Sequence, residues 1–210
     1  MNRRIITISR EFNSGGDEIA TKLAALLEVP LVGREEVKTR MKQKGIEGDT
    51  FDRYDERSTN SFLYSLAITS VSGHIPGGLD DLMMGDKFFD LQSKVLLECA
   101  TESDGVFLGR CADFILGQKY TPIKIFIHAP FDERVTRTES QYGLKRSHAE
   151  TLVKKSDKKR ASYYSFFTGK TWGEASNYDF TLNAAVMSAD NCAYALQDLV
   201  NRLSKTADNL

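Results

Sequence analysis

The sequence lacks the features that would place the protein in a membrane, outside the cell or on a nucleic acid. No segment approaches the roughly 18 consecutive apolar residues that a helix needs to cross a bilayer. The charged residues at the N-terminus are followed by too few apolar residues for the core of a signal peptide. The 28 basic and 29 acidic residues nearly cancel, so no global field favours nucleic acid or an anionic membrane. We therefore expect a cytoplasmic protein whose anion-binding sites are built locally.

Cysteine is also scarce. Cys99, Cys111 and Cys192 are an odd number, lie far apart and lack metal-ligand spacing, so we interpret them as reduced structural thiols. The remaining composition is ordinary: 41% hydrophobic and 27% charged residues supply enough apolar side chains for a continuous core. A length of 210 residues suits a single domain, or one domain that carries a helical insertion.

Short β-branched runs alternate with segments of helical periodicity. This alternation indicates parallel βαβ units, and hence a three-layer α/β fold with a five-stranded parallel sheet covered by helices on both faces. In such sheets ligands bind beyond the carboxyl ends of the strands. Residues 45–85 are the least predictable part. The predicted strands are 5–8, 29–32, 105–109, 123–127 and 178–182, and the predicted helices are 19–28, 34–44, 59–71, 86–102, 131–141, 146–166 and 189–204.

The loop after the first predicted strand has the composition of a phosphate cradle. It reads S-R-E-F-N-S-G-G-D-E-I-A from Ser9 to Ala20, and the small residues Ser14, Gly15 and Gly16 let backbone N–H groups turn inward ahead of a helix N-terminus. A full Walker motif adds a lysine and a Ser/Thr, but Gly16 stands where the lysine belongs and Glu18 where the Ser/Thr belongs. The loop is therefore either a degenerate phosphate site or a strand–helix turn without a ligand.

The segment after the third predicted strand, Gly109-Arg110-Cys111-Ala112-Asp113, places an arginine and a carboxylate at the mouth of a buried strand. The planar fork of Arg110 suits bidentate contact with a phosphate, and Asp113 could orient a substrate hydroxyl or that arginine. The alternative is an Arg110–Asp113 ion pair in the first turn of a helix, without a ligand.

Two groups of cations follow in the C-terminal half. Arg134 and Arg137 are three residues apart and share one helical face. A basic run within the long helix predicted over 146–166 is either a solvated face or a lid that brings cations to a transferring phosphoryl group. The run contains Lys154, Lys155, Lys158, Lys159 and Arg160.

Taken together, these segments resemble the cytidylate kinase-like family. The resemblance implies a P-loop nucleotide kinase fold with strand order 2-3-1-4-5, a nucleoside-monophosphate cleft over residues 35–100 and a lid around 140–168. It implies one domain, with its core in 1–34, 103–140 and 169–210, an NMP-binding-like helical region in 35–102 and a lid-like region in 141–168. The matching stretches are 6–24, 109–116, 154–164 and 169–183.

The same resemblance implies ATP as the phosphate donor, with Mg²⁺. The residues implied to bind the donor phosphates are Asn13, Ser14, Gly15, Gly16, Asp17, Glu18 and Arg134. Those implied to act on the transferring group and the acceptor are Arg10, Arg110, Asp113, Arg137 and Arg160, with Arg10 supplying the charge of the missing lysine. Trp172, Tyr163 and Tyr164 also match the pattern, and we interpret them as packing residues.

The sequence departs from the family pattern at three positions. Family members usually have glycine at the position of Asn13 and a basic residue at that of Asp17. Leu108 replaces the acidic residue expected at the end of the third strand, so that strand offers Mg²⁺ no carboxylate. Glu11, Asp17 and Glu18 also add negative charge beside a polyphosphate site.

Three functions remain open on the sequence alone. The first is ATP-dependent phosphorylation of a nucleoside monophosphate or a similar small phosphorylated acceptor. The second is a non-catalytic nucleotide-binding or regulatory protein on a kinase scaffold, and the third is a relic of the fold that acts through protein contacts. The sequence leaves the acceptor and the oligomeric state open, because base discrimination falls in its least predictable part.

Overall fold

The protein is described by a computed structural model, which covers residues 3–55 and 78–207. Its five strands form one parallel sheet in the order β2-β3-β1-β4-β5, as the resemblance predicts. The second strand is shorter than predicted, because Pro30 has no N–H and only its carbonyl joins the ladder, accepting from Val106 N at 3.0 Å. The strands are β1 (Ile5–Arg10), β2 (Leu31–Val32), β3 (Gly105–Leu108), β4 (Ile123–His128) and β5 (Phe180–Asn183).

Helices fill the intervals between the strands. The described ones are α1 (Gly16–Leu27), α2 (Arg34–Gln43), α3 (Gly48–Tyr54), α5 (Gly78–Glu102), α6 (Ala112–Leu116), α7 (Phe131–Tyr142), α8 (Arg146–Thr168) and α9 (Ala189–Ala207), with a 3-10 turn at Ala175–Asn177. Helix α3 lies in a segment without clear helical periodicity, and α5 begins eight residues before the predicted start at residue 86. The helix predicted over 59–71 lies outside the described residues. None of the described helices has a stretch long and apolar enough to span a membrane.

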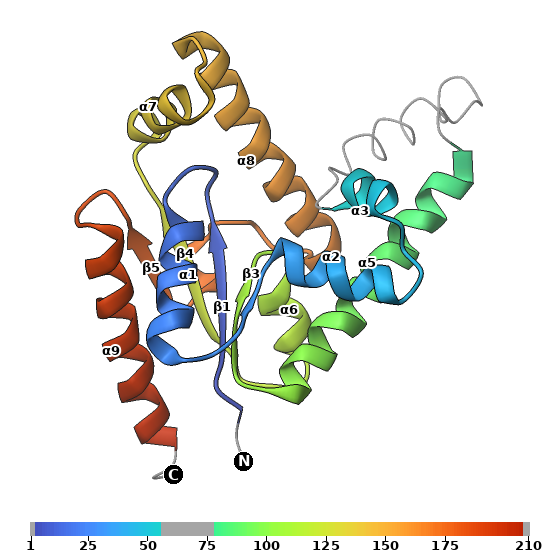
Figure 1. Ribbon diagram of the computed structural model, residues 1–210, viewed down its shortest axis with the longest axis horizontal. Helices are drawn as coiled ribbons and strands as arrows, with labels where there is room; N and C mark the ends of the chain where they lie inside the picture. The colour runs from blue at the N-terminus through green and yellow to red at the C-terminus, as the bar shows by residue number, and fades with distance from the viewer. Residues whose placement is uncertain (1–2, 56–77, 208–210) are drawn as a thin grey trace.

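The sheet separates two apolar layers, as predicted. Successive residues of β1 point to opposite faces, so Ile6 and Ile8 join one buried cluster and Ile5 joins the other. Helices α1 and α9 cover the first face. Helices α2, α5 and α6 and the last turns of α8 contribute to the cluster on the second face (Figure 1). Both faces of the sheet are therefore withdrawn from water, and its polar chemistry is confined to its edges.

The carboxyl ends of β1 and β3 meet in the middle of the sheet. These two strands are direct neighbours, while the chain leaves β1 toward β2 and leaves β3 toward β4 on the other side. Such a switch point opens a crevice at the carboxyl edge. The loop after β1 rises at this edge, and α7 and α8 extend beyond it (Figure 1). Tyr163 and Tyr164 of α8 are buried against the core, which confirms their interpretation as packing residues.

Candidate functional site

The loop between β1 and α1 has the backbone shape that its small residues allow. Gly15 has a φ of 94° and Asn13 a φ of 56°, both in the left-handed region. Asparagine tolerates this region better than other side-chain-bearing residues, which explains how it can occupy a position where glycine is usual. The Asn13 side-chain amide also donates to the Thr138 hydroxyl at 2.8 Å and so holds the turn against α7.

Several backbone amides of this loop have no acceptor within the described part of the chain. The N–H of Ser14 donates to the carbonyl of Glu11 and that of Gly16 to the Ser14 hydroxyl, both at 3.3 Å. By contrast, the N–H groups of Asn13, Gly15 and Glu18 meet no protein oxygen there. They precede or begin the 12-residue helix α1, whose N-terminus carries positive partial charge. The loop therefore presents amide donors suited to an anion.

Each acidic side chain around the loop is offset by a cation. This pairing reduces the negative charge that the sequence places beside the amides. The carboxylates of Asp17 and Glu18 are exposed, so their two pairs contribute modest stability. The pairs are Glu11 with Arg134 at 3.2 Å, Asp17 with Arg10 at 2.9 Å, and Glu18 with Lys22 at 3.6 Å.

Arg10 and Gly16 fill the same space. A Cβ added to Gly16 would lie 2.6 Å from the Cβ of Arg10 and 2.8 Å from its Cγ. A side chain at residue 16 would force β1 and α1 apart while Arg10 is in place, and this steric cost disfavours the Walker lysine there. The Arg10 guanidinium donates to the Asp17 carboxylate through Nε at 3.3 Å and Nη2 at 2.9 Å. The positive charge thus comes to the start of α1 from the end of β1.

Helix α7 contributes two arginines with different surroundings. Arg137 is exposed and donates to the carbonyl of Asn13 at 3.0 Å, and its Nη1 would lie 2.9 Å from a Cβ at Gly15. It therefore lies directly against the loop. Arg134 is buried and donates to the carbonyls of Phe12 and Ala129 at 3.2 and 3.0 Å.

Asp157 fastens α8 to the loop. Its carboxylate accepts from the backbone N–H of Phe12 at 2.8 Å and from Arg134 Nη1 at 2.6 Å. Arg134 is thereby part of a connection between the loop, α7 and α8, in addition to its predicted place near the donor phosphates. The sequence reasoning did not single out Asp157, because a single acidic residue within a basic run carries no signal of its own.

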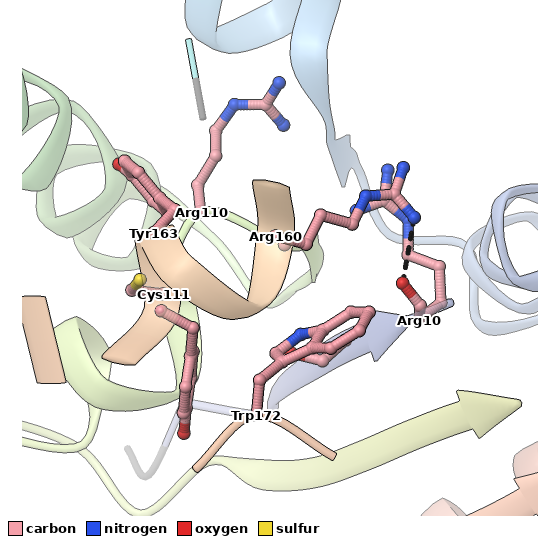
Figure 2. Close-up of a pocket in the computed structure, with 9 residues that line it drawn as sticks. Arg10, Arg110, Cys111, Arg160, Tyr163 and Trp172 are labelled. Atoms are coloured by element: carbon pink, nitrogen blue, oxygen red, sulfur yellow. Dashed lines mark hydrogen bonds between the residues drawn. The ribbon is translucent and has the colours of Figure 1, made fainter. Parts of the chain in front are cut away.

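A cleft of about 270 Å³, a volume that includes solvent at its mouth, opens at the carboxyl ends of β1 and β3 (Figure 2). Arg160 of α8 crosses it and donates to the backbone carbonyl of Arg10 at 2.9 Å, the dashed line in Figure 2. Three predicted arginines, Arg10, Arg110 and Arg160, therefore share one cleft. Its lining consists of Ser9, Arg10, Gly109, Arg110, Cys111, Arg160, Tyr163, Tyr164 and Trp172.

Arg110 is held by a partner that the sequence reasoning missed. Its Nε and Nη2 donate to the two carboxylate oxygens of Asp55 at 3.0 and 2.9 Å, and both side chains are buried. The pair with Asp113 that the sequence allowed as an alternative is not the one formed. Asp55 precedes Arg110 by 55 residues in the chain, so no local spacing signals the contact. Arg110 and Cys111 both have a φ of 56°, a strained conformation typical of functional turns.

Asp113 lies behind the cleft. Its Oδ2 accepts from the Tyr164 hydroxyl at 2.7 Å, and its buried Oδ1 has no partner in the described part of the chain. Burial raises the pKa of Asp113 because the charged carboxylate is poorly solvated there. Burial, together with the nearby charge of Asp113, also raises the pKa of Tyr178 to about 12. Asp113 thus reaches the cleft through Tyr164, which lines it.

Trp172 serves both the packing and the cleft. Its ring meets that of Phe126 edge-on with centroids 5.3 Å apart, and it packs against the core cluster on the second face of the sheet. The same side chain forms part of the cleft lining (Figure 2).

Comparisons with known proteins agree with the fold. The profile of the cytidylate kinase-like family matches residues 5–186. An uncharacterised protein from Eubacterium ventriosum is 22% identical, with a TM-score of 0.70 and coverage of 95% of this chain and 99% of that one. Shikimate kinase from Bacteroides thetaiotaomicron is 14% identical, with a TM-score of 0.54 and coverage of 94% and 98%. Protein TT1252 from Thermus thermophilus is 18% identical, with a TM-score of 0.50 and coverage of 97% and 99%. A search of curated proteins gives no match. At these identities the structural matches establish the fold.

Proposed function

Because the chain belongs to the cytidylate kinase-like family, we propose that it is an ATP-dependent phosphotransferase acting on a nucleoside monophosphate or a similar small phosphorylated acceptor. One observation carries the proposal: Arg10, Arg110 and Arg160, from different elements, line one cleft beside a loop in which several N–H groups have no acceptor among the described residues. Phosphoryl transfer requires this convergence of positive charge and little covalent chemistry from the protein. We propose the cytoplasm as its location, since its three cysteines are free thiols.

On the donor side, the loop at 13–18 binds the triphosphate. The N–H groups of Asn13, Gly15 and Glu18 donate to phosphate oxygens, and Arg137 adds a cation from α7. Arg10 supplies the charge that a Walker lysine would bring from residue 16. Arg134 keeps the loop in register with α8 through Asp157.

A magnesium ion would neutralise the phosphates of the donor. The described residues contain no group of three or more His, Cys, Asp or Glu side chains that could hold a metal ion. Mg²⁺ commonly keeps several waters and binds through one or two carboxylates together with substrate phosphates. Asp17 and Glu18, exposed in the first turn of α1, are the carboxylates that fit this mode.

In the transfer step, an oxygen of the acceptor phosphate attacks the γ-phosphorus, and the bond to the bridging β–γ oxygen breaks to release ADP. Arg160 and Arg10 stabilise charge on the transferring group, and Arg110 faces the acceptor side of the cleft. Asp113 orients the acceptor through the Tyr164 hydroxyl. Catalysis is therefore positioning and charge stabilisation.

A second function, nucleotide binding without catalysis, is favoured by other contacts of the same site. Arg10 and Arg110 are engaged by the protein's own carboxylates, and β3 ends at Leu108 without an acidic group for Mg²⁺. A scaffold of this kind would bind nucleotide in a regulatory role.

Two assays separate the functions. ADP release is measured with ATP, Mg²⁺ and each common nucleoside monophosphate in turn, and turnover with at least one acceptor is the expected result. Thermal stabilisation by ATP is measured with and without Mg²⁺, since a ligand at 100 times its Kd stabilises by about 2.7 kcal/mol. Stabilisation without turnover on any acceptor favours the regulatory protein, and the absence of both contradicts each proposal.

A matched pair of variants tests the assigned loop. Arg137→Ala removes a cation that contacts Asn13, and we expect ATP binding to weaken by about tenfold or more, as expected for a lost charged hydrogen bond. Lys158→Ala removes an exposed cation of α8 that is outside the cleft lining, and we expect ATP binding to be unchanged. Equal effects of the two variants would show that the loop is not the nucleotide site.

A further inference from the structure

Arg110 and Arg34 both form ion pairs with the carboxylate of Asp55. Arg110 contributes a two-pronged contact at 3.0 and 2.9 Å, and Arg34 Nε lies 3.1 Å from the Asp55 Oδ2. The Lys159 ammonium donates to the backbone carbonyl of the same aspartate at 3.0 Å. Three cations, from α2, from the turn after β3 and from α8, therefore surround one residue, whose side chain is only 7% exposed.

This arrangement has the geometry of an oxyanion-binding site that is already filled. Two parallel N–H donors of a guanidinium fit the two oxygens of a carboxylate and two oxygens of a phosphate equally well. The Arg110 side chain lines the cleft (Figure 2). It lies at some distance from the hydrogen bond between Arg160 and Arg10. An oxyanion that enters the cleft toward Arg110 would need the donors that Asp55 now occupies.

We propose that Asp55 is an internal counter-ion of the acceptor site, which the oxyanion of the acceptor must displace from Arg110 and Arg34. The inference rests on the proposed function in one respect, namely that the oxyanion belongs to the phosphoryl acceptor. Displacement leaves the buried guanidinium of Arg110 paired, since a phosphate replaces the carboxylate, and it returns the Asp55 carboxylate to water. Asp55 thereby sets the affinity that an anion needs in order to bind Arg110 and Arg34. Weakly bound or singly charged anions do not displace the carboxylate, and a phosphate dianion does.

Asp52 of α3 provides a matched control, because Asp55 directly follows the end of the same helix. It lies three residues before Asp55, and its carboxylate accepts from Arg34 at 2.7 Å and from Lys38 at 2.8 and 2.9 Å. Its side chain is about half exposed, and its hydrogen bonds in the described part of the chain come from Arg34 and Lys38 and not from Arg110. Neutralising Asp52 changes the charge near Arg34 without opening the two-pronged site on Arg110.

The test measures binding of inorganic phosphate to the full chain by titration calorimetry, without nucleotide. Asp55→Asn is nearly isosteric and removes the competing charge, so we expect phosphate to bind at least about tenfold more tightly than to the wild type, because a like charge a few ångströms away is removed. Asp52→Asn should change the affinity by less than about threefold. The gain should vanish in the double variant Asp55→Asn/Arg110→Lys, which loses the fork. Unchanged or weaker phosphate binding by a folded Asp55→Asn protein overturns the proposal.

A measurement on the wild type covers the case in which Asp55→Asn does not fold. The ¹⁵N guanidinium resonance of Arg110 Nε is followed during a phosphate titration, with Arg110→Lys used for its assignment. Exchange of Asp55 for phosphate should shift this resonance, and a resonance unchanged at the highest phosphate concentration overturns the proposal. Both readouts are independent of turnover. If Asp55→Asn binds phosphate more tightly but the wild type turns over no acceptor, the proposed function fails and this inference stands. If the wild type turns over an acceptor but Asp55→Asn binds phosphate no more tightly, this inference fails and the proposed function stands.

Discussion

Replacing Gly16 by alanine tests the exclusion of a side chain from the start of α1. The added Cβ would lie 2.6 Å from the Cβ of Arg10 and 2.8 Å from its Cγ, whereas carbon atoms in contact sit about 3.5–4.0 Å apart. A Cβ atom cannot rotate away, so β1 and α1 must separate by about 1 Å. Overpacking of this kind costs about 1–3 kcal/mol. In a chain of this size, that loss corresponds to a decrease in Tm of roughly 2–12 °C.

A double-mutant cycle connects the cost to Arg10. Arg10→Gly removes the two carbons that crowd residue 16, so Gly16→Ala should cost about 1–3 kcal/mol less in the Arg10→Gly background than in the wild type. The free energy of unfolding is measured by urea titration for the wild type, both single variants and the double variant. The matched control is Gly85→Ala within α5, where an added Cβ meets nothing within 4 Å. Alanine is the better helix former by about 1 kcal/mol, so this variant should be as stable as the wild type or more so.

The cycle has a clear contrary outcome. If Gly16→Ala is as stable as the wild type, or if its effect is the same with and without Arg10, then Arg10 is not what excludes a side chain from residue 16. The variant Arg10→Gly/Gly16→Lys tests the role of the missing lysine in ATP binding, because it puts glycine and lysine where the Walker motif has them. It should bind ATP more tightly than Arg10→Gly alone if one cation at this turn is what the triphosphate needs.

Two further predictions concern the surroundings of the cleft. Burial raises the pKa of Tyr178 to about 12, above its ordinary value of about 10, so the neutral phenol is favoured in the folded state. This contribution to stability is complete below about pH 10 and is lost as the pH rises toward about 12, so Tyr178→Phe should flatten the decline in Tm between about pH 10 and 12; an unchanged slope would contradict it. Asp157→Asn weakens the contacts with Phe12 N and Arg134, and should lower the free energy of unfolding by about 1–3 kcal/mol and speed hydrogen exchange at the Phe12 amide. Unchanged exchange at that amide would show that α8 is not fastened to the loop there.

Much of the fold could be predicted because its signals are local. The β-branched run of β1 and the helical spacing of α1 each lie within about a dozen residues, and their alternation along the chain specifies a parallel sheet. The small residues Ser14, Gly15 and Gly16 likewise predict a tight turn with inward N–H groups. Helix α3 and the early start of α5 were missed, because Gly and Asp interrupt the apolar pattern there and tertiary packing supplies what periodicity does not.

The site was predicted as a set of residues and not as a set of contacts. The sequence identified Arg110 and allowed it Asp113 as a neighbour, since the two are three positions apart. The fold instead pairs Arg110 with Asp55, and turns Asp113 toward Tyr164. A guanidinium takes the carboxylate that the backbone brings opposite its two donors, and chain separation does not enter that choice.

The sequence by itself determined that a small-residue loop would follow the first strand, and that its usual lysine would be missing. The tertiary structure decided how the loop keeps its charge balance: Arg10 covers Gly16 and meets Asp17, while Arg134 meets Glu11. These contacts depend on distances of a few ångströms between side chains from β1, α1 and α7. Such distances are set only when the strands and helices pack, because Coulomb and steric energies change steeply over that range.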